Sequence, residues 1–450
     1  MLDELRRELG GVLVTDAAAL EELRSDKSGQ RSDSAPLALV EAREIAHVQA
    51  ALRWAARHGV PVVPRGAGTG LAGGAIARAG ELVVSTAAMT RILEISREDE
   101  LAVVEAGVIN AELNAALAPH GLWYAPDPAS RAISTIGGNI ATNAGGLMCV
   151  KYGVTREAVL GLTVVLADGR LLELGHRTVK GVTGYDLTAL FIGSEGTLGI
   201  VVEATLRLRP LVRGELVTMS VAFPDAERAA AAASAITAAG IRPAALELLD
   251  GAALAAIGAH LGLALGGGAL LLVRCDGASA VAEAQHAREV VEAHGGTATL
   301  AADEAEGERL FAVRRAFHPA MESRGTVLIE DVAVPRSRLA SMFAAIARIE
   351  REFGIRIPTV AHAGDGNLHP NFVFEPGDGE FAVPAVVWEA ADALFRECLA
   401  LGGTLTGEHG VGLLKRRWLR QELGDDSLEL QRRLKAVFDP LGILNPGKVF

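Results

Sequence analysis

Two histidines flank a tight polar turn in the C-terminal half of the chain. His362 and His369 stand on either side of Gly-Asp-Gly-Asn at residues 364–367, with apolar β-type runs around them. This pattern predicts a β-hairpin. Residues opposite each other in a hairpin have Cβ atoms about 5 Å apart, so two imidazole nitrogens can reach one metal ion at about 2 Å each. The hairpin therefore offers two candidate metal ligands.

A carboxylate and a third imidazole follow further along the chain. Glu408 and His409 lie between glycines in Gly-Glu-His-Gly at residues 407–410. Together with the hairpin they would make a mixed nitrogen and oxygen metal site. The sequence does not show that the two segments meet. A hydrogen-bonded structural histidine is at least as common as a ligand, so that alternative stays open for each residue.

A basic segment at residues 311–318 offers a binding group for an anion. Arg314 can hold a carboxylate through two parallel N–H donors, and His318 ends the segment. From the sequence alone, a solvated helix arginine is the favoured interpretation of Arg314.

Four glycine-rich segments occupy the N-terminal half, at residues 64–74, 126–146, 181–187 and 193–201. Glycines let successive backbone N–H groups face a phosphate without obstruction by Cβ atoms, so the first segment can serve as an anion cradle. A tight turn is the alternative. The small residues, amides and hydroxyls of all four segments suit a long, flat ligand that the backbone approaches closely.

The first segment also matches the dinucleotide pattern G-x-G-x-x-G at residues 68–73. That pattern belongs to a strand-loop-helix unit, whose helix opens directly after the loop. Here Gly73, Gly74 and Gly80 interrupt any such helix. Glu94 stands near the distance of the expected acidic residue, but it lies inside an apolar β run. The sequence therefore disfavours a NAD site.

The sequence pattern that predicts helices and strands changes along the chain. Residues 1–34 have the pattern of a helical leader with a polar end, and residues 35–210 alternate short β runs with helices and glycines. A second α/β region begins near residue 215. Apolar periodicity predicts helices at 43–58, 225–239, 279–294, 338–353 and 388–401, and strands at 60–63, 82–84, 269–273, 326–329 and 371–374.

One stretch without charge, residues 251–273, is long enough to span a bilayer. Its glycines, including the run at residues 266–268, divide it into a helix at 252–260, a turn and a strand at 269–273. We therefore expect a buried helix–strand unit and no transmembrane segment.

Composition narrows the class of protein. The chain has 450 residues, of which 50% are hydrophobic and 22% charged, as expected for a globular protein. Its 43 Lys and Arg against 55 Asp and Glu give a net charge of −12, which argues against a nucleic-acid partner. Its three cysteines lack the C-x-x-C spacing of iron–sulfur or zinc-ribbon ligands and fit a reducing compartment. The first residues lack the apolar core of a signal peptide, so we expect a cytoplasmic protein.

The order of the four glycine-rich segments resembles the FAD-binding domain of the vanillyl-alcohol oxidase/para-cresol methylhydroxylase superfamily. Within it, the chain is similar to the group of the glycolate oxidase FAD-linked subunit and D-lactate dehydrogenase. The resemblance implies an α+β fold, with a two-part FAD-binding domain at residues 1–212 and a ferredoxin-like α/β substrate cap with the metal-binding hairpin at 213–405. A C-terminal segment at 406–450 would complete the active site against the flavin.

The resemblance also assigns residues to the cofactor. The first segment would cradle the FAD pyrophosphate, the second would line the isoalloxazine and ribityl chain, and the fourth would hold the adenosine half. The implied positions are Arg65, Gly66, Ala67, Gly68, Thr69, Gly70, Leu71, Pro126, Thr135, Gly138, Thr142, Asn143, Gly145, Glu195, Gly196, Ile200 and Asn445. The first loop lacks the histidine that some relatives use for covalent attachment, so non-covalent FAD is expected.

The same resemblance implies a reaction, the oxidation of a D-2-hydroxy acid to the 2-oxo acid with hydride transfer to flavin N5. His409 would be the catalytic base, and Arg314 would hold the substrate carboxylate as a second catalytic residue. The implied substrate-binding residues are Arg314, Asn371 and His318. The implied ligands of a divalent metal, zinc before manganese or iron, are His362, His369 and Glu408.

Ile329 departs from the pattern of relatives that oxidise 2-hydroxyglutarate, which carry a lysine at this position. A second substrate carboxylate would lack its cation here. The departure favours a short or apolar acid, D-lactate or glycolate.

Three other functions stay open. An alkyl-dihydroxyacetone-phosphate synthase-like flavoenzyme would use the same scaffold, a flavin subunit could act only within a larger complex, and a metal hydrolase would hold no flavin. In the oxidation, electrons would leave to oxygen, a quinone, an electron-transfer flavoprotein or an iron–sulfur subunit. A homodimer and attachment to the inner membrane face through a partner are also open.

Overall fold

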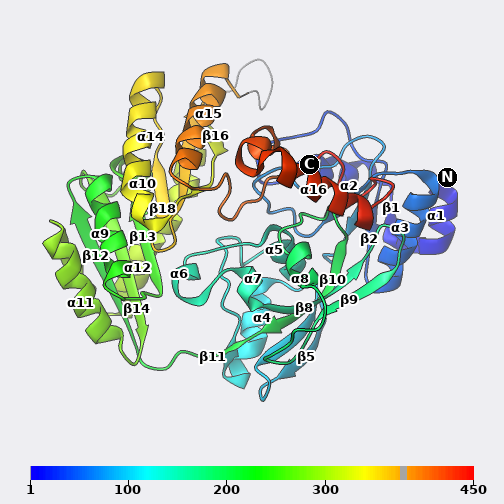
Figure 1. The fold of residues 1–450 in the computed structure, drawn as a ribbon, viewed down its shortest axis with the longest axis horizontal. Helices are drawn as coiled ribbons and strands as arrows, with labels where there is room; N and C mark the ends of the chain where they lie inside the picture. The colour runs from blue at the N-terminus through cyan, green and yellow to red at the C-terminus, as the bar shows by residue number, and fades with distance from the viewer. Residues whose placement is uncertain (1, 376–382) are drawn as a thin grey trace. The chain divides into compact units, whose positions relative to one another are not determined.

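A computed structural model of the protein describes residues 2–375 and 383–450 (Figure 1). The chain forms two compact units that do not follow its order. The first unit contains residues 1–145, 153–211 and 408–450, and the second contains residues 146–152 and 212–407. The C-terminal end of the chain thus belongs to the unit that the N-terminal end begins.

A small sheet opens the first unit. Its order is β1-β2-β4-β3, in which β2, β4 and β3 are parallel and β1 is antiparallel to β2. Helix α3 connects β2 to β3 and buries Leu52 and Trp54 in the core of this sheet. The helix and the two β runs predicted here are confirmed. The bounds are α1 (Leu2–Leu9), β1 (Leu13–Val14), α2 (Ala17–Glu21), β2 (Ala38–Glu41), α3 (Ile45–His58), β3 (Val62–Arg65) and β4 (Leu82–Ser85).

An antiparallel sheet of order β5-β6-β10-β8-β9 follows in the first unit. Its core contains Tyr124 and Phe191, and Phe191 meets Phe438 of the C-terminal helix edge-on, with ring centroids 5.3 Å apart. The bounds are β5 (Ile92–Ser96), β6 (Leu101–Glu105), α4 (Asn110–Leu117), β7 (Leu122–Trp123), α5 (Ile136–Thr142), α7 (Thr155–Ala158), β8 (Val159–Val165), β9 (Leu171–Gly175), α8 (Leu187–Phe191), β10 (Ile200–Arg207) and β11 (Arg209–Pro210).

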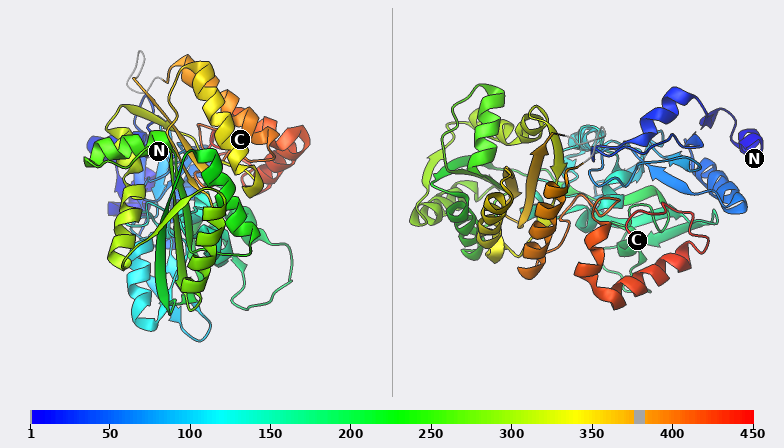
Figure 2. Two further views of the ribbon diagram at one scale, coloured as in Figure 1. Left: turned by 90° about the vertical axis from the view of Figure 1, so that its left-hand side faces the viewer. Right: turned by 90° about the horizontal axis from the view of Figure 1, so that it is seen from above.

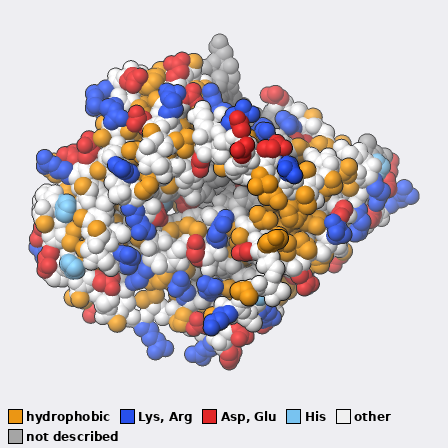
Figure 3. Space-filling view, in the orientation of Figure 1, with side chains coloured by type: hydrophobic (Ala, Val, Ile, Leu, Met, Phe, Trp, Pro, Cys, Tyr) orange, Lys and Arg blue, Asp and Glu red, His pale blue; other side chains and the backbone are white. Residues whose placement is uncertain are grey.

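The C-terminal segment completes the first unit. Helix α16 (Leu419–Phe438) bends at Gly424, and the tail after it runs beside β3, where the N–H of Val62 donates to the carbonyl of Ile443. Apolar side chains of α16 that stay exposed include Leu430 and Val437. Hydrophobic side chains gather on part of the face of the molecule that Figure 3 shows. Residues far apart in sequence thus share one unit.

The second unit is built on a sheet of order β15-β12-β14-β13-β18-β19-β16, with β17 also paired to β19. Every residue of the central strand β13 is buried, because helices cover both faces of the sheet. Its bounds are α6 (Cys149–Tyr152), β12 (Glu215–Phe223), β13 (Ala245–Leu249), β14 (Ala269–Gly277), β15 (Thr297–Leu300), β16 (Thr326–Ile329), β17 (Val332–Ala333), β18 (Thr359–His362) and β19 (Asn367–Phe374).

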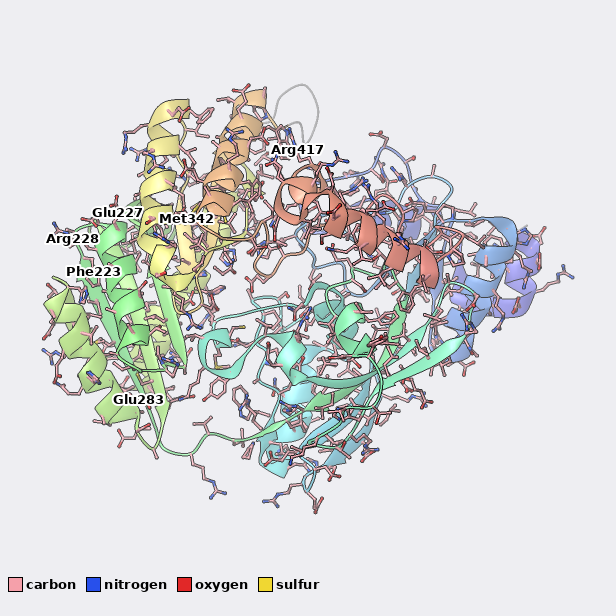
Figure 4. The ribbon with its side chains drawn as sticks, in the orientation of Figure 1. Phe223, Glu227, Arg228, Glu283, Met342 and Arg417 are labelled. Atoms are coloured by element: carbon pink, nitrogen blue, oxygen red, sulfur yellow. The ribbon has the colours of Figure 1, made fainter. Side chains whose placement is uncertain are left out.

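Two helix layers sandwich this sheet. On one side α9 packs against α11 and α14, and α14 lies beside α15 (Figure 2). Met342 of α14 is fully buried there, whereas Glu227 and Arg228 at the start of α9 are exposed (Figure 4). On the other side, α10, α12 and α13 pack on β13, β14 and β18. The bounds are α9 (Ala226–Ala238), α10 (Gly251–Leu261), α11 (Ala280–Ala293), α12 (Glu304–Arg315), α13 (Phe317–Glu322), α14 (Leu339–Phe353) and α15 (Ala385–Ala400).

The uncharged stretch at residues 251–273 forms helix α10, a glycine turn and the start of β14, as predicted. Asp250 begins α10, because its carboxylate accepts a hydrogen bond from the N–H of Ala253 at 2.7 Å. Among the described helices, none combines the length and the apolar character needed to cross a membrane. The mixed α+β fold expected from the sequence is confirmed.

Candidate functional site

The register of three strands gathers polar side chains on one face of the sheet in the second unit. β18 and β19 form the predicted antiparallel hairpin, and Glu247 of β13 is the cross-strand partner of His362. Side chains alternate along a strand, so His369 and Asn371 share a face of β19. Cross-strand partners also share a face, and the partner of His369 is Val360, two residues before His362. Glu247 and both histidines therefore project from the same side of the sheet.

His362 and His369 are diagonal neighbours, not direct partners as the hairpin prediction assumed. His362 is paired with Asn367. The two imidazoles nevertheless meet edge to face, with ring centroids 5.0 Å apart and an interplanar angle of 84°. Each residue is 7% exposed. Two imidazoles this close can offer one nitrogen each to a single ion.

Glu247 forms a hydrogen bond with His362. It is fully buried, and its Oε1 lies 2.7 Å from Nδ1 of His362. An ionised carboxylate can only accept, so Nδ1 carries the hydrogen and Nε2 is the nitrogen left to act as a ligand. This is the arrangement that orients metal-binding histidines in proteins.

Arg314 shares the same carboxylate. Its Nε donates to Oε2 of Glu247 at 2.8 Å, and its side chain is 12% exposed. The interpretation of Arg314 as a solvated helix residue is therefore wrong, because its guanidinium contacts a buried acid. Since the contact uses Nε, the two terminal nitrogens retain the fork geometry that binds a carboxylate.

Asp331 supports the other histidine. Its Oδ1 accepts a hydrogen bond from Nδ2 of Asn367 at 2.7 Å, and its Oδ2 accepts one from the hydroxyl of Thr406 at 2.6 Å. The distance from Oδ1 to Nδ1 of His369 is 3.7 Å. Asp331 is fully buried, so each histidine of the hairpin has a buried carboxylate beside it.

Asn371 and Ile329 are cross-strand partners at the edge of this polar group. The amide nitrogen of Asn371 donates to the carbonyl of His369 at 2.9 Å, while its buried Oδ1 has no partner among the described residues. His318, predicted to bind substrate, is 45% exposed in its side chain, with Nε2 3.1 Å from Oε1 of Glu322.

In the first unit, the first and second glycine-rich segments lie against one another, whereas the third is exposed, with Val182 99% and Tyr185 95% accessible. A Cβ at Gly66 would collide with the Thr135 hydroxyl, and that hydroxyl caps α5 by accepting from the N–H of Gly138 at 3.2 Å. The first and second segments therefore touch through a contact that only glycine permits. The Arg65 side chain donates to the carbonyls of Ala75 and Ser25 at 2.8 and 3.1 Å, so it braces the loop.

Three more segments join this group: the fourth glycine-rich segment through Glu195, the loop at residues 411–412, and the C-terminal tail through Asn445. The amide nitrogen of Asn445 donates to the carbonyls of Glu195 and Gly74, at 2.7 and 3.0 Å. The Glu195 carboxylate accepts hydrogen bonds from the N–H groups of Val411 and Gly412. Burial raises the pKa of Glu195 to about 7, although these two donors lower it. The side chain of Ile200, predicted to hold adenosine, packs in the hydrophobic core.

Glu408 and His409 open the C-terminal segment of the first unit. Oε1 of Glu408 and Nε2 of His409 are 3.7 Å apart. The Glu408 carboxylate lies against Gly145, where a Cβ would collide with it. The second glycine-rich segment therefore ends beside the two residues that the resemblance assigns to metal binding and catalysis.

Two family models together match most of the chain. The FAD binding domain matches residues 36–175, and the C-terminal domain of FAD linked oxidases matches residues 214–449. The chain belongs to the FAD-linked oxidase family. It is thus a FAD-dependent oxidoreductase, as the resemblance implied.

Relatives of known name cover most of the chain. Glycolate oxidase subunit GlcD of Bacillus subtilis is 41% identical, over 93% of this chain and 89% of the relative. GlcD of Escherichia coli is 37% identical, over 92% and 83%. D-Lactate dehydrogenase of Archaeoglobus fulgidus is 35% identical, over 89% and 88%.

Solved structures share the fold at lower identity. p-Cresol methylhydroxylase matches with a TM-score of 0.82 at 17% identity, covering all of this chain and 96% of its own. Alkyldihydroxyacetonephosphate synthase matches with a TM-score of 0.75 at 20% identity, covering 99% and 84%. These likenesses show that the chain shares the fold of p-cresol methylhydroxylase.

Sequence reasoning missed the two buried carboxylates. Glu247 gave a signal, since it is the only ionisable residue in the buried run Ala245–Leu249. Asp331 follows the predicted strand at residues 326–329 and received no role from the sequence. A charge inside a fully apolar strand indicates a buried partner, yet the sequence cannot name that partner.

Proposed function

We propose that this protein oxidises a small D-2-hydroxy acid, D-lactate or glycolate, to the 2-oxo acid. The observation that carries the proposal is the group of His362, His369, Asn371 and the Arg314–Glu247 pair on one face of the sheet. An arginine beside paired imidazoles suits an acid that bears a carboxylate and an adjacent hydroxyl. The names of the relatives fit the same substrate class.

The metal ligands in this proposal are His362, His369 and Glu408. Glu408 directly follows Gly407, which packs so closely on Asn367 of the hairpin that a Cβ would collide with its amide. A divalent ion, when bound, would lower the pKa of the substrate hydroxyl, and the mixed donor set suits zinc, manganese or iron.

The remaining residues position the substrate and move its proton. Arg314 would hold the substrate carboxylate, and Asn371 would form a hydrogen bond with the substrate. Neutral His409 would take the proton of the substrate hydroxyl. FAD, when bound, supplies the hydride acceptor. Ile329, opposite Asn371, leaves no cation for a second carboxylate, which favours the short acids.

The test is anaerobic reduction of the purified flavoprotein. D-Lactate or glycolate should bleach the flavin absorbance, L-lactate and D-2-hydroxyglutarate should act far more slowly, and a chelator should slow the reaction until zinc, manganese or iron is restored. His409→Ala should keep its flavin but react at least about a hundredfold more slowly. Full-rate bleaching by chelated protein would remove the metal from the proposal, and full-rate bleaching by the variant would remove the base.

We also infer that the electrons leave to a separate acceptor. The relatives from Bacillus subtilis and Escherichia coli are named as subunits of glycolate oxidase. An iron–sulfur protein, an electron-transfer flavoprotein or a quinone would each fit this role. Reoxidation of the substrate-reduced protein by oxygen, by a quinone analogue and by a one-electron dye will separate the classes of acceptor; rapid reoxidation by oxygen alone would contradict the inference.

A further inference from the structure

Glu247 occupies an unusual place for an acid. It lies in the middle of β13, where all five residues are buried, and none of its surface is exposed. A carboxylate placed there loses its hydration, which is costly unless charged or donating groups replace the water. The same strand positions its apolar neighbours Ala245 and Leu249 in the core beneath α10 and α12. An apolar residue would serve packing alone, so the acid needs another explanation.

Each carboxylate oxygen of Glu247 serves a different functional residue. Oε1 lies 2.7 Å from Nδ1 of His362, and Oε2 accepts a hydrogen bond from Nε of Arg314 at 2.8 Å. His362 comes from β18 and Arg314 from α12, so the acid links functional side chains of two different elements.

We propose that Glu247 is a positioning residue that couples the metal ligand His362 to the substrate-binding residue Arg314. The proposal rests on the proposed function and deepens it. Acceptance by Oε1 keeps the hydrogen on Nδ1 of His362 and presents Nε2 to the ion. Acceptance by Oε2 fixes the plane of the guanidinium fork. Both the metal and the substrate carboxylate are then held through one side chain.

This arrangement predicts that a substitution of Glu247 disturbs His362 and Arg314 together. Glu247→Gln has a single accepting oxygen, so it can satisfy only one of the two donors. Glu247→Asp keeps the buried charge but is one methylene shorter, so it cannot reach both partners at their present distances. Either change should weaken metal binding and substrate binding together, although Glu247 is not itself proposed to bind the metal or the substrate.

The experiment compares the two variants with wild type and with Glu308→Gln. Glu308 is on the same helix as Arg314 and pairs with Arg274 at 2.8 Å and with Arg315 at 3.3 Å, so its loss removes more exposed ion pairs of that helix without touching His362. Zinc affinity is measured on metal-stripped flavoprotein by competition with a chromophoric chelator. The D-lactate concentration that half-saturates flavin reduction is measured on metal-loaded protein, and thermal unfolding is recorded without metal.

We expect Glu247→Gln and Glu247→Asp to weaken zinc binding by about 10- to 100-fold and to raise the half-saturating D-lactate concentration in parallel. Glu308→Gln should change both by less than about twofold. Wild-type zinc affinity in a folded Glu247→Asp protein would overturn the coupling while leaving the proposed function intact. Wild-type protein that binds no divalent metal would overturn both.

Discussion

The carboxylate of Glu195 holds the backbone of Gly412, whose N–H donates to Oε2 at 2.9 Å, and a second donor, the N–H of Val411, reaches Oε1 at 2.7 Å. Gly410 packs so closely that a Cβ would lie 2.9 Å from this carboxylate. The fourth glycine-rich segment therefore holds in place the loop that carries Glu408 and His409. The side chain of Glu195, which the resemblance assigns to the adenosine half of FAD, is thus hydrogen-bonded to the backbone of this loop.

Replacing Glu195 should loosen that loop. Glu195→Ala leaves two part-buried or buried N–H groups without their acceptor, so we expect the free energy of unfolding to fall by about 1–3 kcal/mol. Amide hydrogen exchange at Val411 and Gly412 should accelerate. Glu195→Gln retains one accepting oxygen and should show a smaller change in both measurements. Equal exchange in wild type and Glu195→Ala would contradict this role.

Asp250 should make stability depend on pH. Burial raises the pKa of its carboxyl to about 7, although the N–H groups of Ala253 and Thr359 oppose this by donating to it. The ordinary value is 3.8, so between about pH 4 and 7 the folded protein binds more protons here than the unfolded chain. The contribution of Asp250 to unfolding free energy is therefore greatest at low pH and declines as pH rises through this window.

Urea unfolding at several pH values will measure that decline. The difference in unfolding free energy between wild type and Asp250→Asn should shift against the wild type as pH rises from about 4 to 7, because asparagine does not titrate. Parallel curves for the two proteins would show that Asp250 is already ionised in the folded state throughout this range.

Ile329→Lys should alter substrate preference. Ile329 is the cross-strand partner of Asn371 and shares its face, so a lysine there adds a cation beside the polar group. We expect the kcat/KM ratio for D-2-hydroxyglutarate over D-lactate to rise by at least about tenfold, since an added charge partner contributes on the order of 1–3 kcal/mol. Thr326→Lys, on the opposite face of the same strand, is the matched control and should leave the ratio unchanged. The same gain in both variants would attribute the effect to net charge alone.

Asn445→Ala should weaken flavin retention. Its amide joins Gly74 of the first glycine-rich segment to Glu195 of the fourth, and removing it leaves both carbonyls without that donor. The flavin should dissociate faster on dilution or mild urea treatment. Asn114→Ala removes two comparable hydrogen bonds to Tyr124 elsewhere in the same unit and controls for general destabilisation. Faster flavin release in both variants alike would argue against a specific role.

Local chemistry was readable from sequence because it depends on neighbouring residues. The turn at residues 364–367 predicted the hairpin, the glycines at 266–268 divided the uncharged stretch, and periodic apolar residues predicted α3, α9 and α14 close to their observed bounds. The flavin scaffold was recognisable because its glycine-rich segments recur in a characteristic order. All of these signals are carried by contiguous residues.

Tertiary structure alone decided which distant residues meet. The pairing of β13 with β18 brought Glu247 beneath His362, and the packing of α12 on the same face brought Arg314 to the same carboxylate. Strand order and register set these contacts, and a shift of one residue would turn each side chain to the opposite face. The sequence determined that acids, imidazoles and an arginine are present. The long-range pairing of strands determined which of them form hydrogen bonds and ion pairs and lie in one site.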